Sequence, residues 1–169
     1  MAERTILPFG NSLLRKIAKP VEEVNPRMLK LLDDMVDTLY ATEGRAGLAA
    51  PQIGILRRVV VMDCGEGLIE LINPEIMESS GEQFGPEGCL SYPGYNGMVT
   101  RSHYVKVSSL NRQGEPFILE AEGYLAVCIQ HEIDHLNGIL FIDHVKDDFL
   151  YHEQDGHRVR LMDVLKLTR

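Results

Sequence analysis

Residues 123–137 read GYLAVCIQHEIDHLN, and this stretch decides the fold. Its first half, from Tyr124 to Ile129, is apolar on every side, which is typical of a helix buried inside a domain. Gly138 follows directly, and glycine suits the left-handed residue with which many helices end. We therefore predict a helix over Gly123–Asn137 that lies within the core, with the rest of the chain packed around it.

The second half of this helix carries two histidines, His131 and His135, four residues apart. Side chains at this spacing lie on one helical face and can bind a single metal ion. Glu132 points about 100° away around the helix, so it can border the ion without binding it, as a general base acting on water would. The alternative is a structural helix with incidental histidines, but polar residues in so apolar a helix are costly without partners.

A catalytic metal usually has three protein ligands and an open position, so a third ligand must come from elsewhere. Cys128 shares the face of His131, but three side chains spread over roughly 10 Å of one straight helix cannot converge on one ion. We therefore interpret Cys128 as pocket wall or core. Cys89, in a stretch rich in glycine and proline, is the better candidate. It could instead be an inert buried thiol or a nucleophile paired with histidine.

The remaining pattern alternates short strands with turns. Asn25 and Pro26 form a typical helix start, and apolar residues at helical spacing extend the predicted helix to about Ala41. The predicted strands are Arg57–Asp63, Leu68–Asn73, Glu75–Phe84, Tyr104–Leu110 and Pro116–Glu120, with residues 85–97 predicted to be irregular. Strands flanked by two helices indicate an α+β fold, in which antiparallel β-sheets pack around the buried central helix that carries the histidine pair.

Length and composition narrow the class of protein. A chain of 169 residues is expected to form one domain, residues 1–169, with a polar tail (147–169) of unassigned structure. The net charge of −8 disfavours nucleic acid as a partner, including sequence-specific recognition. Three cysteines argue against a disulfide framework. Because neither a signal peptide nor an apolar run of ~20 residues is present, we expect a cytoplasmic protein without a membrane partner.

Three motifs resemble those of the peptide deformylase family of bacterial type. Residues 47–52 (GLAAPQ), 87–91 (EGCLS) and 130–138 (QHEIDHLNG) occur in the order of the family's motifs, and the resemblance spans roughly residues 5–145. One departure concerns the first motif, in which family members usually carry Gly-Ile before the first glycine of GLAA. Arg45 and Ala46 stand there in this chain.

The resemblance implies a metal-dependent hydrolase, active in protein biosynthesis, that removes the N-formyl group from the N-terminal formyl-methionine of new polypeptides and releases formate. Glu132 would be the catalytic acid and base, while the Gln52 side-chain amide and the Leu90 backbone N–H would stabilise the oxyanion. The native metal would be Fe²⁺, for which Zn²⁺ or Ni²⁺ can substitute. The metal ligands implied are Cys89, His131 and His135.

The resemblance also implies a substrate pocket and partners. The formyl-methionyl nascent peptide would contact Ala46, Gly47, Glu87, Tyr124, Val127 and Cys128. For the last three, plain helix core is the alternative. The basic tail, residues 156–169, could contact ribosomal RNA, although a solvated helical face explains the same charges.

Two further functions remain open at this stage. Metalloproteases of the two-histidine helix type share part of the pattern, but they generally take histidine or glutamate as the third ligand. A peptide-binding relative that has lost turnover is hinted at only by Arg45, and the presence of Glu132 and Gln52 argues against it.

Overall fold

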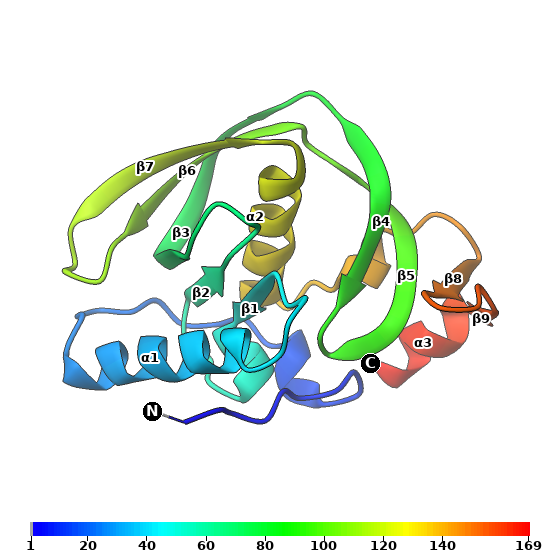
Figure 1. Cartoon of the computed structure of the whole chain (residues 1–169), viewed down its shortest axis with the longest axis horizontal. Coiled ribbons are helices and arrows are strands. Elements are labelled where there is room, and N and C mark those ends of the chain that lie inside the picture. Colours follow the sequence, from blue (N-terminus) through cyan, green and yellow to red (C-terminus); the bar gives the residue numbers. More distant parts are fainter. Residues whose placement is uncertain (1) are drawn as a thin grey trace.

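Helix α2, Gly123–Leu136, lies at the centre of the computed structural model, which describes residues 2–169 (Figure 1). A five-stranded antiparallel sheet lies on one side, in the order β1 (Gly47–Ala49), β2 (Val59–Met62), β3 (Ile69–Ser80), β6 (Tyr104–Leu110) and β7 (Pro116–Glu122). A second antiparallel sheet has the order β4 (Gln83–Cys89), β5 (Tyr92–Arg101), β8 (Phe149–His152) and β9 (Arg158–Arg160). The predicted α+β class is confirmed.

The other helices surround this centre. Helix α1, Pro26–Tyr40, begins where the Asn25 side chain accepts a hydrogen bond from the Met28 N–H, as expected for an asparagine cap. The remaining helical segments are η1 (Ser12–Arg15), η2 (Ala50–Ile53), η3 (Phe141–His144) and α3 (Leu161–Leu167). Within residues 2–169, none of the helices combines the length and the apolar character that crossing a bilayer demands.

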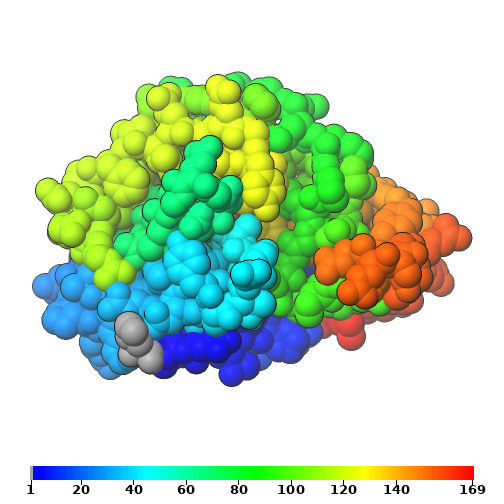
Figure 2. Space-filling model, viewed as in Figure 1, coloured from blue at the N-terminus to red at the C-terminus, as the bar shows by residue number. Residues whose placement is uncertain are grey.

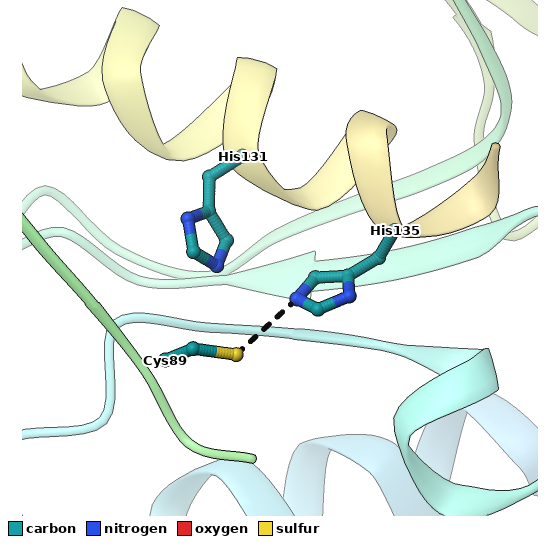
Figure 3. Close-up of side chains that lie close together, drawn as sticks. All are labelled: Cys89, His131 and His135. Carbon is teal, nitrogen blue, oxygen red and sulfur yellow. Dashed lines mark hydrogen bonds between the residues drawn. The ribbon is translucent and has the colours of Figure 1, made fainter. Parts of the chain in front are cut away.

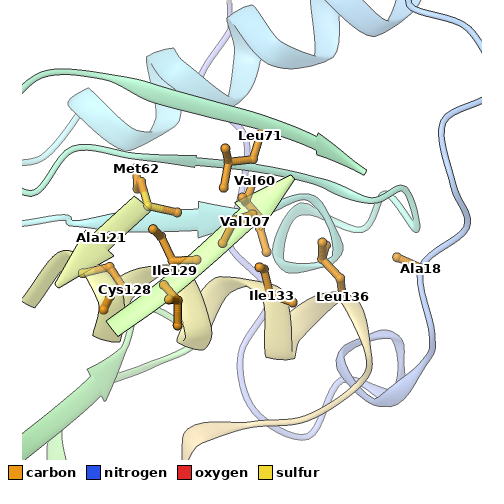
Figure 4. Close-up of a cluster of buried hydrophobic side chains, with 13 residues drawn as sticks. Ala18, Val60, Met62, Leu71, Val107, Ala121, Cys128, Ile129, Ile133 and Leu136 are labelled. Carbon is orange, nitrogen blue, oxygen red and sulfur yellow. The ribbon is translucent and has the colours of Figure 1, made fainter. Parts of the chain in front are cut away.

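The core joins α2 to the five-stranded sheet (Figure 4). Ile129, Ile133 and Leu136 of the helix are buried against the sheet, whose contributions include Val60, Met62, Leu71, Val107 and Ala121. Burying one such side chain contributes about 1.5–3 kcal/mol relative to leaving it exposed. This packing fixes the opposite face of α2, which carries the two histidines, toward the second sheet.

The ends of α2 follow the prediction, and its first turn departs from it. Gly138 adopts the left-handed conformation, with φ at 71°. The first turn, however, is not buried on all sides, because Tyr124 is 60% exposed. The expectation of a fully buried first half is therefore wrong at that residue.

The prediction that residues 85–97 are irregular is wrong. They form most of the hairpin of β4 and β5, with Pro86 opposite Met98 in the register. Strand β4 lies at the edge of its sheet, where proline is tolerated because the open side needs no N–H donor. The register shifts between Glu87 and Cys89, so the hairpin is distorted at the predicted metal ligand.

The prediction of two separate strands, over residues 68–73 and 75–84, is also wrong. Strand β3 runs unbroken from Ile69 to Ser80, and Phe84 belongs to β4. The register shifts between Ile72 and Glu75, and the intervening Asn73 has a positive φ of 51°. Asn73 and Pro74 thus lie in a β-bulge within one continuous strand.

The tail, residues 147–169, adds β8 and β9 to the edge of β5 and ends in α3. Its apolar residues Leu150, Leu161 and Val164 are buried in a cluster with Phe141 of η3. The single domain of residues 1–169 stays a prediction.

Candidate active site

The side chains of Cys89, His131 and His135 lie together, although Cys89 and His131 are 42 positions apart in the sequence (Figure 3). One donor atom from each lies within 4.8 Å of the others, and Cys89 Sγ is 3.4 Å from His135 Nε2. Metal–ligand bonds of about 2.0–2.3 Å in a tetrahedron place neighbouring ligand atoms about 3.3–3.6 Å apart. The thiol and the two imidazoles therefore fit a divalent metal ion.

Glu87 orients one of these rings. Its Oε1 lies 3.0 Å from His131 Nδ1, so that nitrogen can donate to the carboxylate and leave the Nε2 lone pair toward Cys89. Burial raises the pKa of Glu87, but the hydrogen bonds from Arg101 and His131 outweigh this and bring the pKa to about 2. Glu87, predicted only as a pocket residue, also fixes a candidate ligand.

A buried ion cluster that the sequence did not indicate supports Glu87. Arg101 donates two hydrogen bonds to Glu87, at 2.8 and 2.9 Å, and one to Asp134 at 2.6 Å. Asp134 also lies 2.9 Å from His144 Nε2. Arg101 is flanked by Thr100 and Ser102, so its local sequence gave no signal that its charge is buried or which residues are its partners.

Glu132 stands beside the three donors in a buried position, 5% exposed. Its Oε1 is among the buried polar atoms of the described residues that have no hydrogen-bond partner. Burial is the main cause that raises the pKa of Glu132, to about 7, and a bound cation would lower it. A carboxylate with a free oxygen next to a metal-binding group can accept a proton from water there.

Gln52 and Leu90 approach the same point from two other segments. Gln52, buried in η2, accepts a hydrogen bond from the Ala49 N–H at 2.9 Å, which fixes its amide. Its Nε2 then points to Ser91 Oγ at 3.2 Å and Cys89 Sγ at 3.6 Å. Leu90 follows Cys89 in the turn between β4 and β5. Both predicted oxyanion donors thus adjoin the thiol, while Ser91 was not predicted.

A cleft of about 930 Å³ opens onto this group. Figure 2 shows the surface hollowed between the yellow and cyan atoms on one side and the green atoms on the other. Its lining includes every predicted substrate residue: Ala46, Gly47, Glu87, Tyr124, Val127 and Cys128. Gln52, Cys89, Leu90, His131 and Glu132 also line it, whereas His135 is buried and is not part of the lining. Cys128 belongs to the core as well, so its two interpretations are compatible.

The cleft has walls that the sequence did not predict, from residues 3–6, Tyr95 and Glu153. The unusual Arg45 also borders it. Its guanidinium donates to the carbonyl oxygen of Thr38 and lies 3.9 Å from a carboxylate oxygen of Glu3. Arg45 is therefore held at the rim of the cleft by its own neighbours.

Comparison with known proteins gives a consistent result. The family described as "Polypeptide deformylase" matches residues 3–149. The peptide deformylase of Carboxydothermus hydrogenoformans is 56% identical over 143 residues, covering 85% of this chain and 93% of that protein. That of Desulfitobacterium hafniense is 56% identical over 146 residues, covering 86% and 97%. The crystal structure of peptide deformylase from Thermotoga maritima matches with a TM-score of 0.83 at 44% identity, covering 86% of this chain and 99% of that one. This chain belongs to the peptide deformylase family.

Proposed function

We propose that this chain removes the formyl group from the N-terminal formyl-methionine of newly made polypeptides at the cluster of Cys89, His131 and His135. Membership of the family makes the chain a hydrolase that acts on N-formylated nascent peptides; our proposal concerns the residues that do so. One observation supports it above all: Cys89 Sγ lies 3.4 Å from His135 Nε2 beside the unpartnered Oε1 of Glu132.

The three donors would hold one divalent ion. Thiolate and imidazole ligands suit ions such as Fe²⁺, Zn²⁺ and Ni²⁺, and Fe²⁺ is the native ion that the family resemblance implies. When bound, the ion supplies Lewis-acid chemistry, which acidifies water and polarises a carbonyl oxygen. The contact between Glu87 and His131 Nδ1 supports this role, because such partners fix the ring of a metal-binding histidine.

Glu132 would move the protons. Its carboxylate accepts a proton from the water that attacks the formyl carbon, then donates it to the nitrogen of the departing amine, and formate leaves. Gln52 Nε2 and the Leu90 N–H donate hydrogen bonds to the formyl oxygen as negative charge develops there. Removing one such donor typically lowers the rate by about 10²–10³-fold.

The peptide would bind as an extended strand beside β1. Strand β1 is at the edge of its sheet, and an extended ligand pairs readily with the open backbone of such a strand. Tyr124, Val127 and Cys128 would then surround the methionine side chain, with Ala46 beside them. Their position in the lining of the cleft supports this arrangement.

A formate-release assay tests the proposal. Protein purified without oxygen, with its metal content measured on the same sample, should release formate from formyl-Met-Ala and leave internal peptide bonds intact. Exposure to air should abolish the activity of the protein as purified with iron, while protein loaded with Ni²⁺ stays active. This result would support Fe²⁺ as the native ion. Formate release that survives Cys89→Ala together with loss of the metal would contradict the assigned ligands. Family membership already argues against the metalloprotease and the non-catalytic alternatives.

Contact of the basic tail with ribosomal RNA stays a prediction. Its support is four basic residues of the tail, Arg158, Arg160, Lys166 and Arg169, against the single acidic Asp163. Arg158 also stacks on the Phe149 ring, 4.2 Å from its centroid. Replacing Arg160, Lys166 and Arg169 by glutamine should weaken cosedimentation with ribosomes. Unchanged cosedimentation would rule out this contact.

A further inference from the structure

A second group of potential metal ligands lies on the hairpin of β8 and β9, away from the cluster at Cys89. It consists of His152, Asp155 and His157, and one donor atom from each lies within 4.8 Å of the others. The family match ends at residue 149, so all three side chains lie beyond the matched region. The proposed deformylation uses none of them.

The hairpin backbone holds the three residues in a compact turn. The His152 N–H donates to the His157 carbonyl oxygen at 2.7 Å, and the Gly156 N–H donates to the His152 carbonyl oxygen at 2.9 Å. His152 also pairs with Tyr95 of β5 in the sheet register. The ligand atoms are thus carried by ordered backbone, which lowers the entropy lost when an ion binds.

The donor atoms already stand near the separations that an ion requires. Asp155 Oδ1 lies 2.6 Å from His157 Nδ1 and 3.6 Å from His152 Nδ1. Two ligand atoms around tetrahedral zinc are about 3.3 Å apart. The His152 and His157 rings are stacked, with centroids 4.7 Å apart and planes 13° from parallel, so the exposed His157 ring must turn out of the stack before both Nδ1 lone pairs can meet at one ion.

Neighbouring groups orient the two rings. The Gln154 N–H donates to His152 Nδ1 at 3.3 Å, so that nitrogen carries a lone pair rather than a proton. A bound ion would replace this hydrogen bond, because the nitrogen has only one lone pair. Tyr95 Oη lies 2.9 Å from His157 Nε2. In the structure, the 2.6 Å contact with the Asp155 carboxylate places a proton on His157 Nδ1, and Nε2 accepts from the Tyr95 hydroxyl. An ion at Nδ1 would displace that proton, and a proton on Nε2 would then be donated to Tyr95 Oη. A hydrogen bond of this kind is the usual support for a metal-binding histidine.

We propose that His152, Asp155 and His157 form a second metal site, which binds a divalent transition ion such as Zn²⁺ through His152 Nδ1, Asp155 Oδ1 and His157 Nδ1. Two imidazoles and one carboxylate suit Zn²⁺, Ni²⁺ or Cu²⁺ rather than Mg²⁺ or Ca²⁺. Asp155 and His157 are 65% and 51% exposed, so water completes the coordination. The site adjoins the cleft, because Tyr95 and Glu153 line it.

Zinc binding to the full-length protein tests this site. Zinc per chain is counted by equilibrium dialysis and elemental analysis for the wild type, for His157→Ala and for the double variant His152→Ala/His157→Ala. His103→Ala is the matched control, because His103 is 52% exposed and its nearest acidic partner, Glu122, is 4.0 Å away. Far-ultraviolet circular dichroism and formate release verify that each variant is folded.

The wild type and His103→Ala should bind two zinc ions per chain, and the double variant one. Asp155→Asn, which keeps the shape of the turn, should lower the affinity for the second zinc ion at least tenfold. One zinc ion per wild-type chain, or two in the double variant, would overturn the proposal. Cys89→Ser should lose the ion of the proposed catalytic site and keep the hairpin ion, so the two proposals can fail separately.

Discussion

Gly47 and Glu132 are in direct contact between β1 and α2, without room for a single additional methyl group. A Cβ atom at Gly47 would lie 2.6 Å from Glu132 Oε2, closer than van der Waals contact allows. The backbone of β1 therefore fixes the carboxylate that we assign to proton transfer. In the binding mode that we propose, the same strand would offer its open edge to the substrate, so one glycine would serve both the peptide and the proposed base.

Gly47→Ala should therefore displace the Glu132 carboxylate. We expect a loss in kcat of about 10²-fold, the lower part of the range for general acid–base catalysis, with the metal retained. Steady-state kinetics on formyl-Met-Ala and metal analysis measure both. Gly85→Ala is the control, because a Cβ there meets nothing within 4 Å. Equal kcat in both variants would show that the contact does not position Glu132.

Glu132→Gln should keep the shape of the side chain and remove its ability to accept a proton. We expect kcat to fall by about 10²–10⁴-fold while one equivalent of metal stays bound at the cluster. Single-turnover formate release and metal content check this, with the exposed Glu122→Gln as control. Wild-type turnover in Glu132→Gln would remove this residue from the mechanism.

Arg101→Met should leave Glu87 and Asp134 buried without their cationic partner. Breaking a buried ion pair by removing one side costs about 3–5 kcal/mol, so the free energy of unfolding should fall by that order. Because Glu87 also holds His131, metal affinity should fall about 10–100-fold. Urea denaturation and competition with a chelator measure the two effects. The control Arg57→Ala, at an exposed arginine, should change neither the free energy of unfolding nor the metal affinity. Equal losses in the two variants would contradict the role of the cluster.

Acid should remove the stabilisation that Arg4 provides through Asp34. The hydrogen bonds from Arg4, at 2.7 and 3.0 Å, are the main cause that lowers the pKa of Asp34, against the opposing effect of its burial. A lowered pKa in the folded state means that the stabilisation is complete above the ordinary aspartate pKa of about 3.9 and is lost as the pH falls through the lowered value.

The free energy of unfolding of Arg4→Ala should therefore be about 1–2 kcal/mol below that of the wild type at pH 7. The two should converge as the pH falls through the lowered pKa of Asp34. Urea denaturation across this pH range measures the difference, with the exposed Arg27→Ala as control. A difference that does not depend on pH would exclude Asp34 as its source.

The sequence alone predicts the elements that are specified by residues close together along the chain. The apolar run of α2, its glycine end and the cap at Asn25 each lie within a few residues of the structure they specify. The hairpin of β4 and β5 was missed because its glycines and prolines favour loops locally, while pairing across the sheet holds them extended.

The candidate site shows the same division. The motifs indicated Cys89 and both histidines, since spacing along a helix and resemblance were enough. Arg101 was missed because its partners Glu87 and Asp134 are 14 and 33 residues away along the chain. Those charges come from β4, β5 and α2, so they meet only when the three elements pack together, and no local pattern reports this.

The shortness of β1 has a consequence for association between copies of the enzyme. An open sheet edge that accepts a peptide can also accept the edge of another molecule, which is a route to aggregation. Strand β1 has three residues, and Gly47 lies within the lining of a cleft. A flexible chain end can enter there, whereas a folded sheet meets the surrounding walls first. With the peptide bound as we propose, this recess would admit a nascent chain and would hinder pairing of β1 with a sheet edge of another copy.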